Sequence, residues 1–419
     1  MQAPVSIEPS IPVFALVGHH GTLGIARSLG RLGIDVYGID ADIAQPAFRS
    51  RYFAGVFEWD LVGRPACETV IFLCERAKAI GQRPLLIPTS DETALMVAEN
   101  ADALSENFVF ANQDAKLITK LVSKQHNYEL ARSAGIPVPE TLFPTSIDEV
   151  RRFSDITPYP LMVKGINGAK LAQRTGRKME FAHSKDELLK LYVEMEDPDE
   201  PNLMLQEYIP GGDDTIWMFD GYFDQNTECR FGITARKIRQ TPPHKGSTSL
   251  GICEHNATVY DLTTRFMKAI GYTGILDIGF RIDSRDGLYK LLDPNPRIGS
   301  TFRLFVGTNG MDTVRYLYMD VTGQALPESK PCEGRKWVAE RPDIHAFSIY
   351  RREGLLTFGQ WLKSFRGVQE FAWFAVDDLK PFWPVIRDVF ANGIRALWRG
   401  LKRIVSVGDY SKDDRASRA

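Results

Sequence analysis

The chain contains 419 residues, of which 44% are hydrophobic, and its 51 basic and 53 acidic residues give a net charge of −2. Such a length and composition are typical of a globular protein with roughly two to four domains. The even balance of charge gives no support for binding to nucleic acid, which usually requires a basic surface. The five cysteines are scattered without CxxC spacing, so we expect neither a zinc site nor a disulfide framework, but a reducing compartment.

The beginning of the sequence and its apolar runs indicate the compartment. The first residues show no basic stretch followed by an apolar core, and no apolar run approaches the roughly 18 residues of a membrane span. We therefore expect a cytoplasmic protein.

The N-terminal segment predicts a strand, a glycine-rich turn, a helix and a second strand. Residues 12–17 are apolar, and Gly18, Gly21 and Gly24 follow before a helical pattern. This order is typical of an open parallel α/β sheet. Asp40 ends the second strand, and glycines with such an acid also resemble a site for a nicotinamide dinucleotide. Taken alone, the motif leaves both interpretations open.

Helices and strands continue to alternate after this opening. The predicted elements are a helix at 66–80, a strand at 84–87, a helix at 117–134, strands at 159–165 and 179–182, a helix at 185–195, a strand at 203–209, antiparallel strands within 217–238 and a helix at 258–270. Residues 165–178 form a loop rich in Gly, Asn, Lys and Arg, which we expect to close over phosphates. The order predicts a parallel α/β part followed by an α+β part.

Residues 274–300 carry the strongest chemical signal in the chain. The run 274–282 is rich in apolar and β-branched residues, residues 284–287 are turn-forming, and Leu288 to Leu292 form a second run that is mostly apolar. This pattern predicts a β-hairpin.

Polar side chains interrupt the hairpin at three places. Asp277 lies in the first strand, and Asp293 and Asn295 are two residues apart at the end of the second. Side chains two apart in a strand leave the same face, so we expect all three to meet there. Two carboxylates and an amide oxygen, with Arg297 on the same side, suit a hard divalent cation that also binds waters and phosphate oxygens.

An alternative interpretation is that Asp-Pro-Asn-Pro, residues 293–296, only ends the hairpin. That interpretation does not explain Asp277, because an unpaired carboxylate inside an apolar strand is costly to bury. A site for a metal ion and phosphates explains both features.

Three further segments precede the hairpin in a fixed order. Ser123-Lys124 comes before the segment 135–139 (Gly-Ile-Pro-Val-Pro), a strand carries Lys164 near its end, and Gln206 to Ile209 ends another strand. Together with the glycine-rich opening and the hairpin, these segments resemble the ATP-grasp superfamily, which includes biotin carboxylase, the large chain of carbamoyl-phosphate synthetase and D-alanine–D-alanine ligase. More loosely, the chain is similar to D-aspartate-ligase-like enzymes. The resemblance covers residues from about 12 to about 320.

The resemblance implies ATP and Mg²⁺ (or Mn²⁺) as cofactors and gives roles to individual residues. Lys124 and Lys164 are expected to bind the nucleotide phosphates, Gln206, Glu207 and Ile209 to contact adenine, and Asp213 or Asp214 to contact the ribose. Asp277, Asp293 and Asn295 are expected to bind the metal, and Arg236, Lys237 and Arg297 to bind phosphate or substrate. Arg297 and Lys164 are also expected to act in catalysis. The chain departs from the usual pattern in having aspartate where the superfamily mostly has glutamate, and in a phosphate loop that is poorer in glycine.

The same resemblance implies the fold class, α/β and α+β. A Rossmann-like pre-ATP-grasp domain is expected at 1–118, the ATP-grasp small lobe at 119–202, the large lobe with the metal site at 203–325, and a C-terminal extension at 326–419. Within the extension, residues 384–405 have one apolar and one basic helical face. This segment is expected to pack on the body or on a partner subunit in a homodimer, and peripheral contact with a membrane is the alternative.

The implied activity is an ATP-dependent ligase that joins a small carboxylate to an amine or a thiol through an acyl phosphate and releases ADP and phosphate. Two alternatives stay open. One is a nucleotide-binding protein without ligase activity, and the other is an NAD(P)-dependent dehydrogenase that uses the N-terminal glycine-rich turn. The sequence does not identify the carboxylate or the amine.

Overall fold

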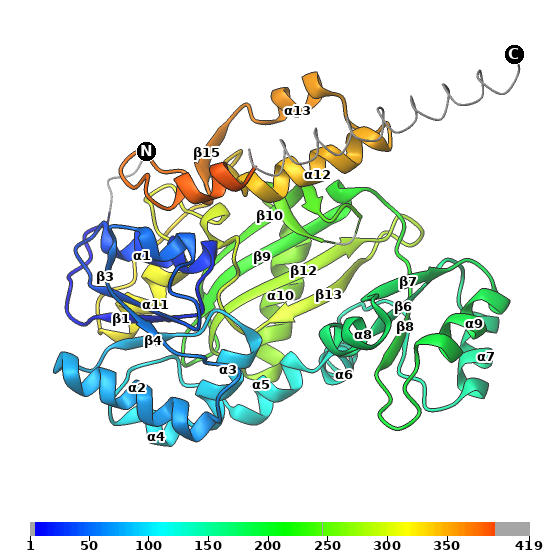
Figure 1. Ribbon diagram of the computed structural model, residues 1–419, viewed down its shortest axis with the longest axis horizontal. Helices are drawn as coiled ribbons and strands as arrows, with labels where there is room; N and C mark the ends of the chain where they lie inside the picture. The colour runs from blue at the N-terminus through cyan, green and yellow to red at the C-terminus, as the bar shows by residue number, and fades with distance from the viewer. Residues whose placement is uncertain (1–4, 245, 390–419) are drawn as a thin grey trace, which may run out of the picture.

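The computed structural model of the protein describes residues 5–244 and 246–389. These residues form three β-sheets with helices packed against them (Figure 1). In the view of Figure 1 the first sheet lies at the left, a seven-stranded sheet in the centre and a smaller four-stranded sheet at the right.

The first sheet is parallel, with the strand order β3-β2-β1-β4. Its strands are β1 (Val13–Leu16), β2 (Val36–Asp40), β3 (Phe53–Glu58) and β4 (Leu85–Ile87), and its helices are α1 (His20–Gly30), η1 (Pro46–Arg49), α2 (Ala66–Ile80), α3 (Asp91–Glu99) and α4 (Ala101–Ser105). The predicted strand–turn–helix–strand opening is therefore present.

Phe48 fills the space beside the glycine-rich turn. A Cβ atom on Gly18 would lie 2.5 Å from the Phe48 ring, and one on Gly38 would lie 2.4 Å from it. Asp40 is held by the fold, because its Oδ2 accepts a hydrogen bond from the Gly18 N–H at 2.7 Å and its Oδ1 accepts one from the Asp42 N–H at 2.8 Å. Gly18 and Gly38 thus leave room for the Phe48 ring, and Asp40 holds the backbone of the turn.

The second sheet is antiparallel, with the order β5-β8-β6-β7. Its elements are β5 (Thr141–Leu142), α7 (Ile147–Ile156), β6 (Leu161–Gly165), α8 (Gly168–Thr175), β7 (Met179–Ala182), α9 (Lys185–Met195) and β8 (Leu203–Glu207). Because β8 pairs with both β5 and β6, it belongs to the sheet of the expected small lobe. The boundary between the two lobes, expected at 202/203, therefore lies after Glu207. The expected loop at 165–178 is largely helix α8. The Asn167 side chain caps this helix by accepting a hydrogen bond from the Lys170 N–H.

The predicted helix at 117–134 is divided in two at Ser123. The two helices are α5 (Ala115–Val122) and α6 (Lys124–Ser133). Ser123 has an extended backbone, and its hydroxyl accepts a hydrogen bond from the His126 N–H as the N-cap of α6. Lys124 therefore occupies the first position of a new helix.

The central sheet has seven strands in the order β13-β12-β9-β10-β11-β14-β15. Its elements are β9 (Ile216–Phe223), β10 (Cys229–Thr241), β11 (Ser247–Cys253), α10 (Ala257–Ile270), β12 (Gly274–Ile282), β13 (Tyr289–Asn295), α11 (Thr313–Val321), β14 (Lys336–Val338), α12 (Glu340–Arg352), α13 (Phe358–Ser364) and β15 (Val368–Phe371), with short 3₁₀ turns η2 (Asp213–Thr215) and η3 (Phe302–Leu304). The predicted hairpin is β12 and β13.

Alternation along β9 shows how both faces of this sheet are covered. Phe219 and Phe223 pack into an apolar cluster with α5, α6 and α10. Met218 and Tyr222 point to the other face, where a second cluster joins the sheet to α11 and to the first sheet. The first sheet and the central sheet therefore share one hydrophobic core.

The residues after 325 do not form a separate layer. Strands β14 and β15 extend the central sheet beyond β11, so the described part of the expected C-terminal extension belongs structurally to the large lobe. The chain is helical at 382–389, and the remainder of the predicted amphipathic helix, 390–405, lies outside the described residues.

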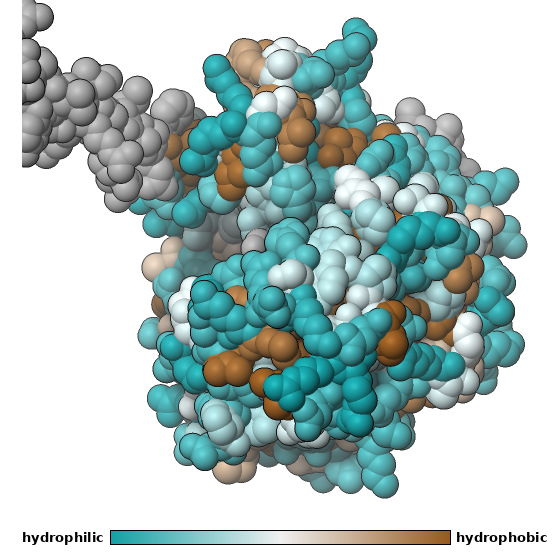
Figure 2. All heavy atoms as spheres, turned by 90° about the vertical axis from the view of Figure 1, so that its right-hand side faces the viewer, coloured by the Kyte–Doolittle hydropathy of each residue, from teal (hydrophilic) through white to brown (hydrophobic). Residues whose placement is uncertain are grey.

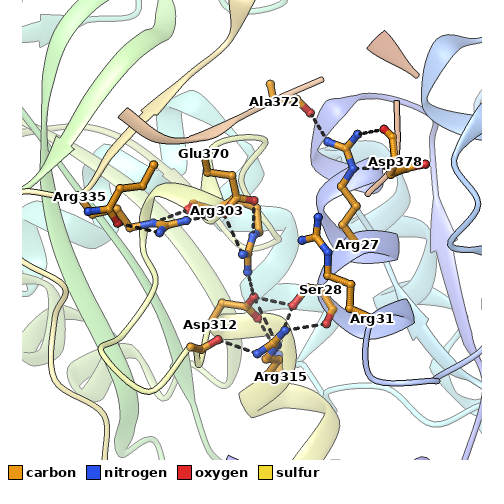
Figure 3. Close-up of polar contacts among 12 residues, drawn as sticks. Arg27, Ser28, Arg31, Arg303, Asp312, Arg315, Arg335, Glu370, Ala372 and Asp378 are labelled. Atoms are coloured by element: carbon orange, nitrogen blue, oxygen red, sulfur yellow. Dashed lines mark hydrogen bonds and ion pairs between the residues drawn. The ribbon is translucent and has the colours of Figure 1, made fainter. Parts of the chain in front are cut away.

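Buried ion pairs connect the first sheet, the central sheet and the C-terminal part (Figure 3). Arg303 in η3 pairs with Asp312 and, at 2.8 Å, with Glu370 of β15. Arg27 of α1 pairs with Asp378 at 3.0 Å, and both side chains are almost fully buried. Burial alone would raise the pKa of Glu370, but the guanidinium of Arg303 lowers it below the usual range.

We expect Glu370→Gln to lower the free energy of unfolding by about 3 kcal/mol near neutral pH, because Arg303 and Arg335 lose a shared buried counter-charge. The lowered pKa means that Glu370 stabilises the fold above the pKa of the unfolded chain and loses this effect as the pH falls. Urea titrations at pH 7 and at acid pH test both statements. Glu68→Gln, in an exposed pair with Arg64, is the control, with an expected change of at most about 1 kcal/mol; equal effects of the two variants would contradict the prediction.

Candidate active site

A cleft of about 940 Å³ lies between the second sheet and the central sheet. Strands β6, β7 and β8 supply residues on one side, and β10, β12 and β13 supply residues on the other. The cleft brings together most of the charged residues that the sequence singles out.

The register of the hairpin places its polar residues on one face. Asp277 pairs with Asn295 and Gly279 pairs with Asp293, so the side chains of Asp277, Asp293 and Asn295 all point to the cleft that they line. Arg297 lies beside them, with Nη2 donating to Asn295 Oδ1 at 3.0 Å and Nη1 3.7 Å from Asp277 Oδ2. The structure thus brings the predicted metal set together.

The chemistry of this set suits a hard cation with several open positions. The described residues contain no group of three or more His, Cys, Asp or Glu side chains that could hold a metal ion. Two carboxylates and one amide leave other coordination sites to phosphate oxygens and water, which is how Mg²⁺ is usually bound beside a nucleotide.

The two hairpin carboxylates are destabilised as anions. Burial, helped by the nearby charges of Asp91 and Asp277, raises the pKa of Asp293 to about 6. Burial also raises the pKa of Asp277, and Arg297 opposes this shift. A bound cation would remove the cost of ionising both groups.

Two lysines face these acids across the cleft, Lys164 on β6 and Lys124 at the start of α6. The Lys164 Nζ donates to Gln206 Oε1 at 2.7 Å, and the Lys124 Nζ donates to the Gly165 carbonyl at 3.0 Å. Burial lowers the pKa of Lys164 to about 8, with the charge of Lys124 adding to the effect and Asp293 opposing it. The break at Ser123 is what directs Lys124 into the cleft.

The structure separates Arg236 from Lys237. Successive residues of β10 point to opposite faces of the sheet, and only Lys237 lines the cleft, where its Nζ donates to the Gly246 carbonyl at 2.9 Å. Burial lowers the pKa of Lys237 to about 8. Arg236 instead pairs with Glu254 at 2.7 Å, so the expected phosphate or substrate role of Arg236 is not supported by its position.

The end of the cleft beyond the lysines is apolar and bounded by the end of β8. Met162, Met204 and Leu292 line it together with Glu207 and Ile209, two residues expected beside adenine. Gln206, also expected there, lines the cleft and donates through Nε2 to the Tyr128 hydroxyl at 2.9 Å.

The Glu207 side chain is engaged by two cations of the central sheet. It pairs with Arg285 at 2.6 Å and with Lys290 at 3.0 Å. Because the Glu207 side chain is occupied by these contacts, a purine at the end of β8 would meet backbone groups and apolar side chains.

Neither acid expected at the ribose lines the cleft. Asp213 Oδ1 accepts from Gln240 Nε2 at 2.7 Å, and Asp213 Oδ2 accepts from the Tyr350 hydroxyl. Asp214 is exposed in η2. Asp213 therefore has a structural role in joining η2, β10 and α12.

Comparison with known proteins identifies the fold. No family model matches the chain. A D-aspartate ligase from Enterococcus faecium is 27% identical over 263 residues, which cover 60% of this chain and 62% of that enzyme. The chain therefore spans less than two thirds of the length of this relative.

Two solved structures share the arrangement of lobes. A biotin carboxylase from Campylobacter jejuni aligns with a TM-score of 0.59 at 15% identity, covering 77% of this chain and 74% of that one. An N5-carboxyaminoimidazole synthetase from Staphylococcus aureus aligns with a TM-score of 0.58 at 14% identity, covering 79% and 83%. The chain has the ATP-grasp fold. The resemblance drawn from the sequence motifs is thereby confirmed.

The first sheet adds a residue that sequence reasoning missed. Asp91 begins α3 at the carboxyl end of β4, and its Oδ1 lies 3.0 Å from Arg297 Nε. The turn Pro88-Thr89-Ser90 before Asp91 follows a predicted parallel strand, and loops in that position commonly face a site. The contact between Asp91 and Arg297, however, could not be inferred without the structure.

Asp220 is the second residue missed. It lies on β9 directly opposite Asp277 and is fully buried, and neither of its carboxylate oxygens has a hydrogen-bond partner among the described residues. Burial, with Asp277 nearby, raises the pKa of Asp220 well above its usual value. A fully buried acid therefore lies beside Asp277, the β12 member of the predicted metal set.

The raised pKa of Asp293 predicts a pH-dependent change in stability. The folded chain keeps the proton up to about pH 6, whereas an unfolded aspartate releases it near pH 4, so ionised Asp293 destabilises the metal-free fold above pH 6. We expect Asp293→Asn to raise the melting temperature at pH 8, and the gain to disappear as the pH falls to about 4.

Thermal melts in a chelating buffer measure this effect. Asp102→Asn, at an exposed position of α4, is the control and should change the melting temperature little at either pH. If Asp293→Asn raised the melting temperature equally at pH 4 and pH 8, the raised pKa of Asp293 would be refuted.

Proposed function

We propose that this ATP-grasp protein is an ATP-dependent ligase that joins a carboxylate to an amine and releases ADP and phosphate. The observation that carries the proposal is the opposition of charges across the cleft, where two carboxylates and an amide on β12 and β13 face Lys124 of α6 and Lys164 of β6. The similarity to a D-aspartate ligase supports the same class of reaction.

The chemistry follows from the poor reactivity of a carboxylate. Transfer of the γ-phosphoryl group of ATP to a carboxylate oxygen gives an acyl phosphate and ADP. An amine then attacks the acyl carbon, phosphate leaves with its electron pair, and the nitrogen loses a proton to give the amide. No covalent bond to the protein is required, so positioning and charge stabilisation account for the catalysis.

The hairpin residues fit a Mg²⁺ ion. Asp277, Asp293 and Asn295 would hold it through oxygen atoms, which Mg²⁺ prefers. When bound, it supplies positive charge next to the phosphates of ATP. Arg297, already held by Asn295 and Asp91, is placed to bind a phosphate or the substrate carboxylate on the side of the first sheet.

The lysines have roles that follow from their places in the cleft. Lys164 and Lys124 lie on the small-lobe side, where they would hold the phosphate tail of a nucleotide whose adenine rests against Met162 and Met204. Lys237 lies on the other wall, close to Asp277, and would bind the transferred phosphoryl group or the carboxylate. Burial makes each of these charges more effective than a charge at the surface.

The two alternatives are less well supported. A dehydrogenase would need room for a dinucleotide beside Gly18, where the Phe48 ring lies, and a free Asp40 carboxylate, which is engaged by backbone N–H groups. A nucleotide-binding protein without ligase activity would bind ATP in the same cleft. Stimulation of ADP release by carboxylic acids together with amines distinguishes a ligase from such a protein.

Oxygen-18 transfer tests the acyl phosphate. A substrate carboxylate labelled in both oxygens should pass one labelled oxygen to the released phosphate, measured by mass spectrometry after a single turnover. A screen of carboxylic acids and amines for stimulated ADP release supplies the substrate. Label in AMP, with pyrophosphate as the co-product, would show an adenylating ligase and refute the mechanism.

Lys164→Met tests the position of the phosphate tail. Loss of a charge-assisted hydrogen bond to phosphate should weaken ATP binding roughly 10- to 100-fold, as measured by calorimetry with Mg²⁺. Lys190→Met, in an exposed position of α9, is the matched control and should bind ATP as the parent protein does. Equal ATP affinities of the Lys164 variant and the parent would remove Lys164 from the nucleotide site.

A further inference from the structure

Helices α12 and α13 form a projecting hairpin, residues 340–366, on the side of the central sheet where the chain ends (Figure 1). Figure 2 shows hydrophobic residues gathered on the projection at the top of the molecule. Leu355 in the connection and Phe358 and Leu362 on α13 are 61%, 52% and 51% exposed. Exposed apolar side chains of this size in one small region indicate a contact surface.

The hairpin is anchored firmly behind these side chains. The Trp361 ring stacks on Phe347 at 4.6 Å, and the Trp361 indole N–H donates to Asp343 at 2.8 Å. Asp343 in turn forms a buried pair with Arg239 of β10 at 2.8 Å. The apolar residues are therefore presented by an ordered element, and their exposure does not come from a poorly packed loop.

Exposed basic side chains lie on the same hairpin as the apolar residues. Arg351, Arg352, Lys363 and Arg366 are all exposed, and within the described part of the chain none of them forms an ion pair. The one exposed acid in the connection, Glu353, lies 3.1 Å from the His244 ring. The surface therefore combines exposed apolar groups with an excess of positive charge.

We propose that the α12–α13 hairpin is a membrane-contact element that binds the surface of a bilayer containing anionic phospholipids. Leu355, Phe358 and Leu362 enter the boundary between headgroups and acyl chains, while the four cations meet lipid phosphates. The contact is peripheral, since no helix within residues 5–244 and 246–389 is long and apolar enough to cross a bilayer.

The composition of the surface favours lipid over protein as the partner. The centre of a stable protein interface is usually depleted of charge and needs roughly 800 Å² from each side, more than three side chains provide. The sequence that follows has the same character as the hairpin. Between 384 and 405 it holds five basic residues and one acid among apolar residues that include Trp398.

The hairpin also contacts the rim of the cleft, which connects the proposed surface to the site. The His244 ring lies 5.5 Å from the Tyr350 ring of α12, and His244 lines the cleft. Binding to a bilayer through α13 would therefore hold the cleft at a short distance from the lipid surface.

Sedimentation of the full chain with lipid vesicles tests the proposal. We expect the protein to bind vesicles of phosphatidylcholine mixed with phosphatidylglycerol, and to bind pure phosphatidylcholine much more weakly. Lys363→Gln and Arg366→Gln should each reduce binding roughly fivefold, and added salt should do the same. Leu355→Ser, Phe358→Ser and Leu362→Ser combined should reduce it at least about tenfold.

Matched controls separate the hairpin from other surfaces. Ile156→Ser with Val193→Ser removes exposed apolar side chains from the small lobe and should leave binding unchanged. Melting temperatures of all variants should match the parent, because every substituted side chain is exposed. A chain ending at residue 389 should retain binding that depends on the hairpin residues.

Three results would overturn the proposal. The first is no binding of the full chain to anionic vesicles. The second is binding that survives the hairpin substitutions and is lost when residues 390–419 are removed. The third is a dimer in solution, without lipid, that the Phe358 and Leu362 substitutions dissociate, because the face would then be a protein interface.

Discussion

Antiparallel pairing of β12 with both β13 and β9 places Asp277 between Asn295 on one side and Asp220 on the other. This row of polar side chains lies on the face of the central sheet that also carries Met218 and Tyr222. Acids in such a place cost free energy unless a cation neutralises them, and Asp220 has no hydrogen-bond partner in the described residues. The two hydrophobic clusters around β9 have to offset this cost, so the extensive core and the candidate site depend on each other.

Buried charges serve two purposes in this protein. Arg303 and Glu370 compensate each other within the central sheet and its C-terminal part, and Arg27 with Asp378 connects α1 of the first sheet to the C-terminal part. Lys164 and Asp293 both line the cleft, form no ion pair within the described residues, and have pKa values shifted in opposite senses. A nucleotide phosphate with its cation carries both kinds of charge and would satisfy both walls at once.

Local pattern was enough to predict some of these features and not others. The β12–β13 hairpin and the common face of its polar residues follow from a period of two, which is a property of a few neighbouring residues. The break at Ser123, the pairing of Arg236 with Glu254 and the contact of Asp91 with Arg297 depend on distant partners. The addition of β14 and β15 to the central sheet was not foreseen, because strands of three and four residues give almost no periodic signal.

The ion pairs of Glu207 have a consequence for how the cleft opens. The small lobe is joined to the rest of the described chain before β5 and after β8, and both crossings lie beside this cluster, since the Leu291 N–H donates to the Pro137 carbonyl at 2.8 Å. Glu207 with Arg285 and Lys290 therefore forms a pivot. A rotation of the small lobe about this point would move Lys164 relative to Asp293 while leaving the charge pairs of Glu207 intact.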